Sequence, residues 1–324
     1  MGYGALGAEV KGNKTVAVGH NALAGQINNG SVDTFNVAVG HDAGGQVTTG
    51  INNTLIGGLA GDSLTASSRN TAVGYNALTA DTLGARNTAV GFGSFASQNF
   101  TSATDSYNTG LGYQAGMLVT TGVENTIIGA LAGDALTDAD YNIAIGSEAL
   151  TSDQIGSKSI AIGRQALFSQ LHSSSAVDTH NIAIGYQAGR SVSTGIKNIL
   201  IGGIAGDAIT TATGNVAMGH SSLSSNTVGS YSVALGFRAL NNQNPSSATD
   251  MYNTAVGTDA GTSVTTGVRN TLMGGLTGDA LTTGRDNIAI GYLALSSETA
   301  SDNSVAIGSC LLYTSDAADE HRRG

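Results

Sequence analysis

A few short motifs in the sequence match patterns that perform chemistry in other proteins. Residues 2–7 read G-x-G-x-x-G, the turn that receives the pyrophosphate of a dinucleotide. Such a site needs a strand before the turn, a long helix after it and an acidic residue about twenty positions further on. Here a new copy of a short repeat begins at once. We therefore predict no dinucleotide site, and the hydrolase, zinc-protease and phosphate-loop motifs are missing as well.

Four aspartates follow a pattern that approaches a calcium-binding nonapeptide, G-G-x-G-x-D-x-U-x, as in residues 57–65. The fourth position is Ala or Thr rather than Gly, and the motif never occurs in tandem. Calcium rolls take their ligands from adjacent turns, whereas these carboxylates are spaced four repeats apart. An aspartate can also cap a turn through its own backbone, and the sequence leaves both readings open. The four residues are Asp62, Asp134, Asp207 and Asp279.

Histidine and cysteine show no metal-ligand spacing. The six His stand at positions 20, 41, 172, 180, 220 and 321. His41 and His220 occupy a position that Tyr75 and Tyr113 hold in other repeats, so we expect turn-flanking side chains rather than ligands. The single Cys excludes a disulfide scaffold and a Cys-ligated zinc site. We predict no catalytic residues, no cofactor and no metal, and therefore a protein that is not an enzyme.

Four insertions are the best candidates for ligand contact, at residues 24–35, 96–107, 168–180 and 241–252. Each ends in Asp and, two residues on, an aromatic residue or His. A carboxylate beside an aromatic ring suits a glycan, and repeated weak contacts give avidity. Alternatively, the loops are solvated and the ring only fastens the next strand. The candidate residues are Asp33, Phe35, Asp105, Tyr107, Asp178, His180, Asp250 and Tyr252.

These residues are spaced by a repeat that covers most of the chain. A five-residue motif recurs, as in Asn70-Thr71-Ala72-Val73-Gly74, and it ends in Gly 17 times. The motif glycines are evenly spaced, as at Gly57, Gly74 and Gly91, except where an insertion lengthens the interval, as between Gly91 and Gly112. A unit of about 17 residues, with four units in a super-repeat of about 72 residues, is typical of a solenoid.

The motif itself reads as a short β-strand. The residue three before Gly is Thr, Val or Ile in every copy, and the residue one before Gly is Val, Ile, Leu or Met. Side chains alternate along a strand, so these two columns share one face. Asn leads 13 of the 17 motifs and can form ladders when strands stack in register. We therefore predict an all-β protein, a parallel β-solenoid of about 17 coils.

The Ala column, two before Gly, faces the other way. It is Ala in 12 of 17 motifs, and no polar residue stands in it. A strand that is apolar on both faces is usually buried on both. We expect the β-branched columns to pack the coil's own core and the Ala column to pack against another chain, most simply in a cyclic oligomer. The alternative is a flat surface of small side chains that needs no partner. Large residues interrupt the column at Leu55, Ile127, Leu200 and Leu272.

Units such as Asn70-Thr71-Ala72-Val73-Gly74 and Ser159-Ile160-Ala161-Ile162-Gly163 resemble the head repeats of trimeric autotransporter adhesins. They are also similar to the long repeats of bacteriophage tail-fibre-like proteins. The resemblance implies a parallel β-solenoid assembled as a homotrimer. It covers about residues 1–309, which we expect to form the solenoid domain, cut at both ends. Residues 310–324 resemble a translated sequencing adapter, so we expect a non-native, disordered tail on a metagenomic fragment.

Composition narrows the function. The net charge of −10 and the 11% of charged residues argue against nucleic-acid binding, and no apolar run is long enough to span a membrane. We expect a structural fibre segment of a virion tail that presents loops to a host-surface glycan or protein. The alternative is a bacterial adhesin head at the cell surface. A polysaccharide-active solenoid enzyme lacks its charged cluster, and an ice-binding solenoid lacks an unbroken Thr array.

Overall fold

The computed structural model describes residues 2–9, 11–28 and 30–311, and it confirms the predicted fold class. These residues form an all-β parallel solenoid of about 17 turns, each of about 17 residues. The chain divides into two compact units, Met1–Ser159 with Leu171–Asp178, and Ile160–Gln170 with Thr179–Gly324. In the described ranges, no helix has the length and apolar character needed to cross a membrane. Most of the proposed tail, residues 312–324, lies outside the described residues.

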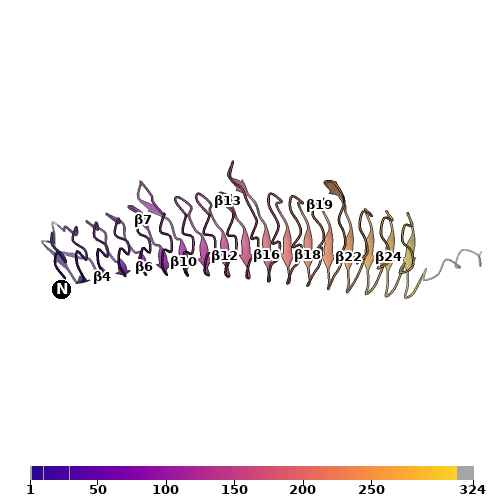
Figure 1. Ribbon diagram of the computed structural model, residues 1–324, viewed down its shortest axis with the longest axis horizontal. Helices are drawn as coiled ribbons and strands as arrows, with labels where there is room; N and C mark the ends of the chain where they lie inside the picture. The colour runs from indigo at the N-terminus through magenta and orange to yellow at the C-terminus, as the bar shows by residue number, and fades with distance from the viewer. Residues whose placement is uncertain (1, 10, 29, 312–324) are drawn as a thin grey trace, which may run out of the picture. The chain divides into compact units, whose positions relative to one another are not determined.

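In the first unit, eight three-residue strands stack in parallel, one per coil (Figure 1). Three two-stranded pairs accompany the insertions. The stacked strands are β2 (Val16–Val18), β4 (Val37–Val39), β5 (Thr54–Ile56), β6 (Thr71–Val73), β8 (Thr88–Val90), β10 (Thr109–Leu111), β11 (Thr126–Ile128) and β12 (Ile143–Ile145). The paired strands are β1 (Gly12–Asn13) with β3 (Val32–Asp33), β7 (Gly84–Ala85) with β9 (Thr104–Asp105), and β13 (Gly156–Ser157) with β15 (Val177–Asp178).

The second unit repeats this arrangement with nine stacked strands and one insertion pair. The stacked strands are β14 (Ile160–Ile162), β16 (Ile182–Ile184), β17 (Ile199–Ile201), β18 (Val216–Met218), β20 (Val233–Leu235), β22 (Thr254–Val256), β23 (Thr271–Met273), β24 (Ile288–Ile290) and β25 (Val305–Ile307). The insertion pair is β19 (Gly229–Ser230) with β21 (Thr249–Asp250). Register is strict, since Ala234 pairs with Ala217 on one side and Ala255 on the other.

The Asn column holds the coils in register. The backbone N–H of Asn70 donates to Oδ1 of Asn53, and that of Asn87 donates to Oδ1 of Asn70. Most of these side-chain amides also donate to a backbone carbonyl further along the chain, as Asn53 does to Ser67 at 2.9 Å. Buried polar groups must find partners, and Asn supplies both an acceptor and a donor. This explains why Asn leads most motifs, as the sequence predicted.

The motif Gly ends each strand with a backbone that other residues rarely adopt. Gly74 has φ of 135°, and a Cβ built there would lie 2.4 Å from the carbonyl oxygen of Gly91 in the next coil. Both the dihedral angle and the space therefore require glycine. The same contact recurs from coil to coil and sets how closely the coils approach.

The Ala column faces the interior of the solenoid, so the predicted Ala interface between chains is wrong. Ala72, Ala89, Ala144 and Ala161 are fully buried within the single chain. The β-branched columns lie on the opposite, outer face and are half-buried or exposed. The reason is volume, because so short a coil encloses a core too thin for two columns of Val and Ile.

The large residues in the Ala column are core residues as well. Leu55 is fully buried, and it occupies the space that side chains at Gly44 and Gly61 would fill, 2.6 and 2.8 Å from their built Cβ atoms. The coil of Ala72 reverses the arrangement, because Leu78 stands where Gly61 stands in the preceding coil. A coil with a large residue in the Ala column thus has Gly four positions after its motif Gly, and a coil with Ala in that column can have Leu there. This alternation of large and small residues in the core explains why the pattern repeats every four coils.

In each unit, the outer face is a strip of two columns whose residues are half-buried or exposed. The 34 positions comprise seven Thr and otherwise Val, Ile, Leu or Met. Leu111 in the first unit exposes 47% of its surface, and Met218 in the second exposes 42%. Monomeric proteins rarely expose continuous apolar surface on this scale.

Candidate functional site

Two histidines and an aspartate converge in the first unit. His20 and His41 each follow the motif Gly in successive coils, so the parallel register places one ring over the other. Their centroids are 5.1 Å apart and the ring planes differ by 7°. The backbone N–H of Asp42 donates to the carbonyl of His20 at 2.9 Å. This ladder bond fixes the carboxylate beside both rings.

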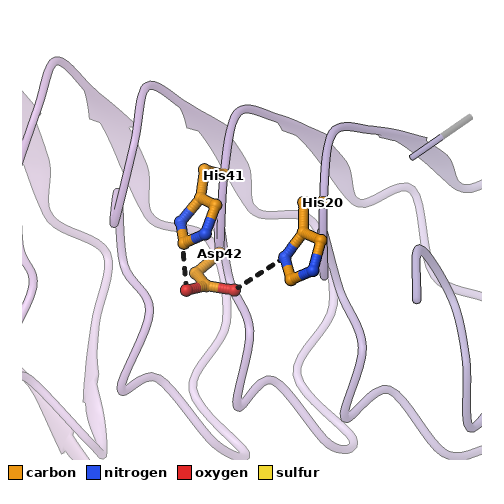
Figure 2. Close-up of side chains that lie close together, drawn as sticks. All are labelled: His20, His41 and Asp42. Atoms are coloured by element: carbon orange, nitrogen blue, oxygen red, sulfur yellow. Dashed lines mark ion pairs between the residues drawn. The ribbon is translucent and has the colours of Figure 1, made fainter. Parts of the chain in front are cut away.

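The ligand atoms of this His–Asp cluster lie within 4.8 Å of one another. Nδ1 of His41 is 3.1 Å from one carboxylate oxygen of Asp42, and Nδ1 of His20 is 4.0 Å from the other. Figure 2 shows the carboxylate reaching toward both rings. The His20 and His41 side chains are about half exposed or more, whereas that of Asp42 is 29% exposed. Solvent therefore reaches the imidazoles while the backbone holds the carboxylate.

A hollow of about 230 Å³ adjoins the cluster. Its lining includes Asn21, Asp42, Gln46 and Asp62, so it is rich in oxygen atoms. Oδ1 of Asp62 accepts a hydrogen bond from the hydroxyl of Thr79 in the next coil. Two carboxylates thus face one small hollow, which gives the region negative charge.

The spacing of the His residues did not reveal this pair. The first insertion lies between His20 and His41 and lengthens their separation beyond a single unit. The repeat does predict the pair, since His20 and His41 are each the first residue after a motif Gly and therefore share a column. His220 holds the same position in the second unit, but there the ring stacks on Phe237 and Nδ1 pairs with the hydroxyl of Ser221 at 2.8 Å.

The Asp of each insertion ends a short extra strand, and the aromatic residue or His follows two positions later. In Figure 1, β7 and β13 of the first unit project on the same side of the stacked sheet. Phe35, Tyr107, His180 and Tyr252 are exposed, and each has φ of 50°. The left-handed backbone turns each ring out of the coil.

In the first two insertions, a Lys or Arg side chain contacts both the Asp and its aromatic neighbour. Lys14 lies 2.7 Å from Asp33, and its Nζ is 4.9 Å from the ring centre of Phe35. Arg86 lies 2.8 Å from Asp105, and its guanidinium is 5.4 Å from the ring centre of Tyr107.

In the third insertion, Asp178 pairs with Lys158. An ion pair of this kind on the surface contributes little stability, but it occupies the carboxylate that a ligand would need.

The fourth insertion replaces the cation with an aromatic ring. Tyr231 stacks on Tyr252 with centroids 5.6 Å apart and planes 9° apart. The Tyr252 hydroxyl donates to Asp250 at 3.2 Å. The charge of Asp250 raises the pKa of Tyr252. The aromatic–carboxylate pair is therefore present, and its role in ligand contact stays a prediction.

A buried polar network supports the second insertion from inside. Gln98 donates to Asp81 at 2.7 Å and accepts from Asn108 at 2.9 Å. Asp81 also accepts from the backbone of Gly84 and Phe100. Burial raises the pKa of Asp81, although these hydrogen bonds offset part of the shift. The buried Gln marks each insertion coil, at Gln26, Gln98, Gln170 and Gln243.

Among the four aspartates of the calcium-like pattern, Asp62 lines the same hollow as Asp42. The hydroxyl of Thr151, one coil on, donates to Asp134. Burial raises the pKa of Asp134, Asp207 and Asp279. Over residues 2–9, 11–28 and 30–311, the His–Asp cluster is the one group of three or more His, Cys, Asp or Glu with converging ligand atoms. Calcium ligation at these four aspartates therefore stays untested, and in the described ranges none of them belongs to a converging group of three or more ligands.

The remaining histidines are scattered. His172 is 8% exposed, and its Nδ1 lies 3.6 Å from a carboxylate oxygen of the fully buried Asp153. His321 lies outside the described residues. No family model matches the sequence, and no curated protein matches it either.

Proposed function

We propose that this chain is a structural segment of a surface fibre, which self-associates as a homotrimer through its outer β-branched face. The observation that carries the proposal is the half-buried to exposed outer strip of Thr, Val, Ile, Leu and Met along the stacked strands. The protein's role in this proposal is mechanical and non-enzymatic.

A second copy of the chain is the occupant that matches the strip best. The strip is uncharged in both columns, and its side chains repeat at the spacing of stacked strands, about 4.8 Å. A partner with the same coil spacing keeps its side chains in register along the strip, and an identical chain has that spacing by construction. Three copies that turn this face inward close a ring and leave no strip exposed.

The insertions lie away from this face, at the short paired strands, and so stay accessible in such an assembly. Together with the resemblance of the repeats, this favours a bacteriophage tail fibre, with a bacterial surface adhesin as the alternative. The insertions would then contact a glycan or protein of the host surface. The fibre would act outside the cell, on a virion tail or on a bacterial surface.

Analytical ultracentrifugation tests the association. We expect the full chain to sediment as a trimer at micromolar concentration. The double substitution Leu111→Lys and Ile145→Lys places charge in the strip on β10 and β12, and we expect it to yield monomers with an unchanged far-UV circular dichroism spectrum. An unpaired charge in an apolar interface is strongly unfavourable.

The matched control is Tyr141→Lys. Tyr141 is 48% exposed, but it lies in a left-handed turn before β12 and outside the two columns of the strip. We expect this variant to remain trimeric. A monomeric parent chain, or equal dissociation of both variants, contradicts the proposal.

A further inference from the structure

We propose that His20, His41 and Asp42 form a binding site for a divalent transition-metal ion such as Zn²⁺. The proposal is independent of the fibre role and of the oligomeric state. It rests on three ligand atoms that the coil register brings within 4.8 Å of one another.

The donor set selects the class of ion. Two imidazole nitrogens and one carboxylate oxygen suit Zn²⁺, Co²⁺, Ni²⁺ and Cu²⁺, whereas Ca²⁺ and Mg²⁺ prefer oxygen ligands alone. Zinc takes His nitrogen at about 2.0–2.1 Å and carboxylate oxygen at a similar distance. The present separations of 3.1 and 4.0 Å between Nδ1 and carboxylate oxygens are close to what two ligands of one ion require. Small rotations of the exposed imidazole rings would bring the ligand atoms to the zinc distances.

The surroundings favour a bound cation with solvent ligands. Three protein ligands leave further coordination positions for water, and the adjoining hollow of about 230 Å³ has room for it. Asp62 lines the same hollow and adds negative charge. In the next coil Gly58 holds the column position of His20 and His41 and brings no ring to that column.

The backbone holds the ligands in place before metal arrives. Tyr3 stacks on His20 at 5.8 Å, and His20 stacks on His41. Asp42 has φ of 53° in the left-handed region and is fixed by its ladder hydrogen bond. Ligands on a rigid ladder lose little conformational freedom on binding.

The repeat supplies substitutions that keep the fold. Tyr stands in the column of His20 and His41 in other coils, as at Tyr75, so His20→Tyr and His41→Tyr preserve ring stacking. Asn stands in the column of Asp42 at Asn76, where φ is 58°, so Asp42→Asn preserves the backbone. Each variant removes one ligand and introduces a residue that the repeat already uses.

Isothermal titration of the untagged full chain with ZnCl₂ tests the site. We expect one ion per chain, and each of the three substitutions should weaken binding at least about tenfold. Co²⁺ provides a spectroscopic readout, and its absorption should lack a thiolate charge-transfer band. Circular dichroism of each variant confirms that the solenoid remains folded.

His220→Tyr is the matched control, because His220 holds the same column position without a second His beside it. We expect its affinity for Zn²⁺ to equal that of the parent chain. Cys310→Ser removes the exposed Cys310 thiol as an alternative ligand, and it should leave binding unchanged because the site does not include this thiol. The proposal is overturned if the parent chain binds no Zn²⁺, if His20→Tyr with His41→Tyr leaves affinity unchanged, or if either control loses as much as the site variants.

Discussion

At the scale of single residues, the buried carboxylate of Asp81 shows how the fold uses polar groups inside a thin core. Its oxygens accept hydrogen bonds from Gln98 and from the backbone N–H groups of Gly84 and Phe100. Burial nevertheless raises the pKa of Asp81 above the ordinary value of 3.8. A group whose pKa is raised on folding stabilises the protein most when it is protonated, and it loses that contribution as the pH rises through the folded-state pKa.

The direction of this pH dependence can be tested with Asp81→Asn. As the pH falls from 7.5 toward 4.5, the parent chain should gain stability relative to the variant, because only the parent takes up the proton at position 81. Urea unfolding followed by circular dichroism at several pH values measures the difference. The control is Asp105→Asn, which removes an exposed carboxylate and changes the net charge equally. Identical pH profiles for Asp81→Asn and the parent would refute the argument.

At the scale of elements, the insertions are additions to a standard coil. Removal of residues 101–104 would reconnect Phe100 to Asp105 and restore the length of a coil without an insertion. Three of the four deleted residues are exposed. Loop length affects stability only weakly, so apart from the loss of the two-residue β7–β9 pair we expect the unfolding free energy to change by less than about 1 kcal/mol.

Urea unfolding measures this deletion, and deletion of residues 126–129 is the matched control. The control removes β11 with the motif Gly129, and it should unfold the neighbouring coils. If the two deletions destabilise the chain equally, the insertion is part of the coil and not an addition. Binding of the deletion variant to host-surface glycans, compared with the parent, then reports on the ligand contact predicted for Asp105 and Tyr107.

The sequence predicts some features of the elements correctly and not others. The period, the strand positions and the role of Asn follow from the repeat, because each column repeats one physical requirement. The inward face did not follow, because alternation places Ala72 and Val73 on opposite faces without saying which face is inside. The volume of the core decides which face lies inside. Only the structure shows this volume, because it places Leu55 against Gly44 and Gly61. The pairing of His20 with His41 depends on column position and not on sequence distance.

At the scale of the whole molecule, each coil contacts only its neighbours, so stability is distributed along the chain. In the first unit, the Gly74 N–H donates to Ile56 in the preceding coil, and the Gly91 N–H donates to Val73. Among residues 30–311, coils several positions apart share no such backbone bonds. Damage to one coil should therefore stay local rather than unfold the unit in a single step.

Ala72→Glu tests this locality and the assignment of the inner face together. Ala72 is fully buried, so a glutamate there places an unpaired charge in the core, at a local cost of about 3–5 kcal/mol. Hydrogen exchange should show protection lost at Gly74 and Gly91 and retained at Gly129 and Gly146. Val73→Glu is the control, because its side chain lies on the outer strip, and it should keep exchange protection in a dissociated chain. Uniform loss of protection across the first unit in Ala72→Glu would show that the coils unfold together, and full protection would show that the Ala column is not the core.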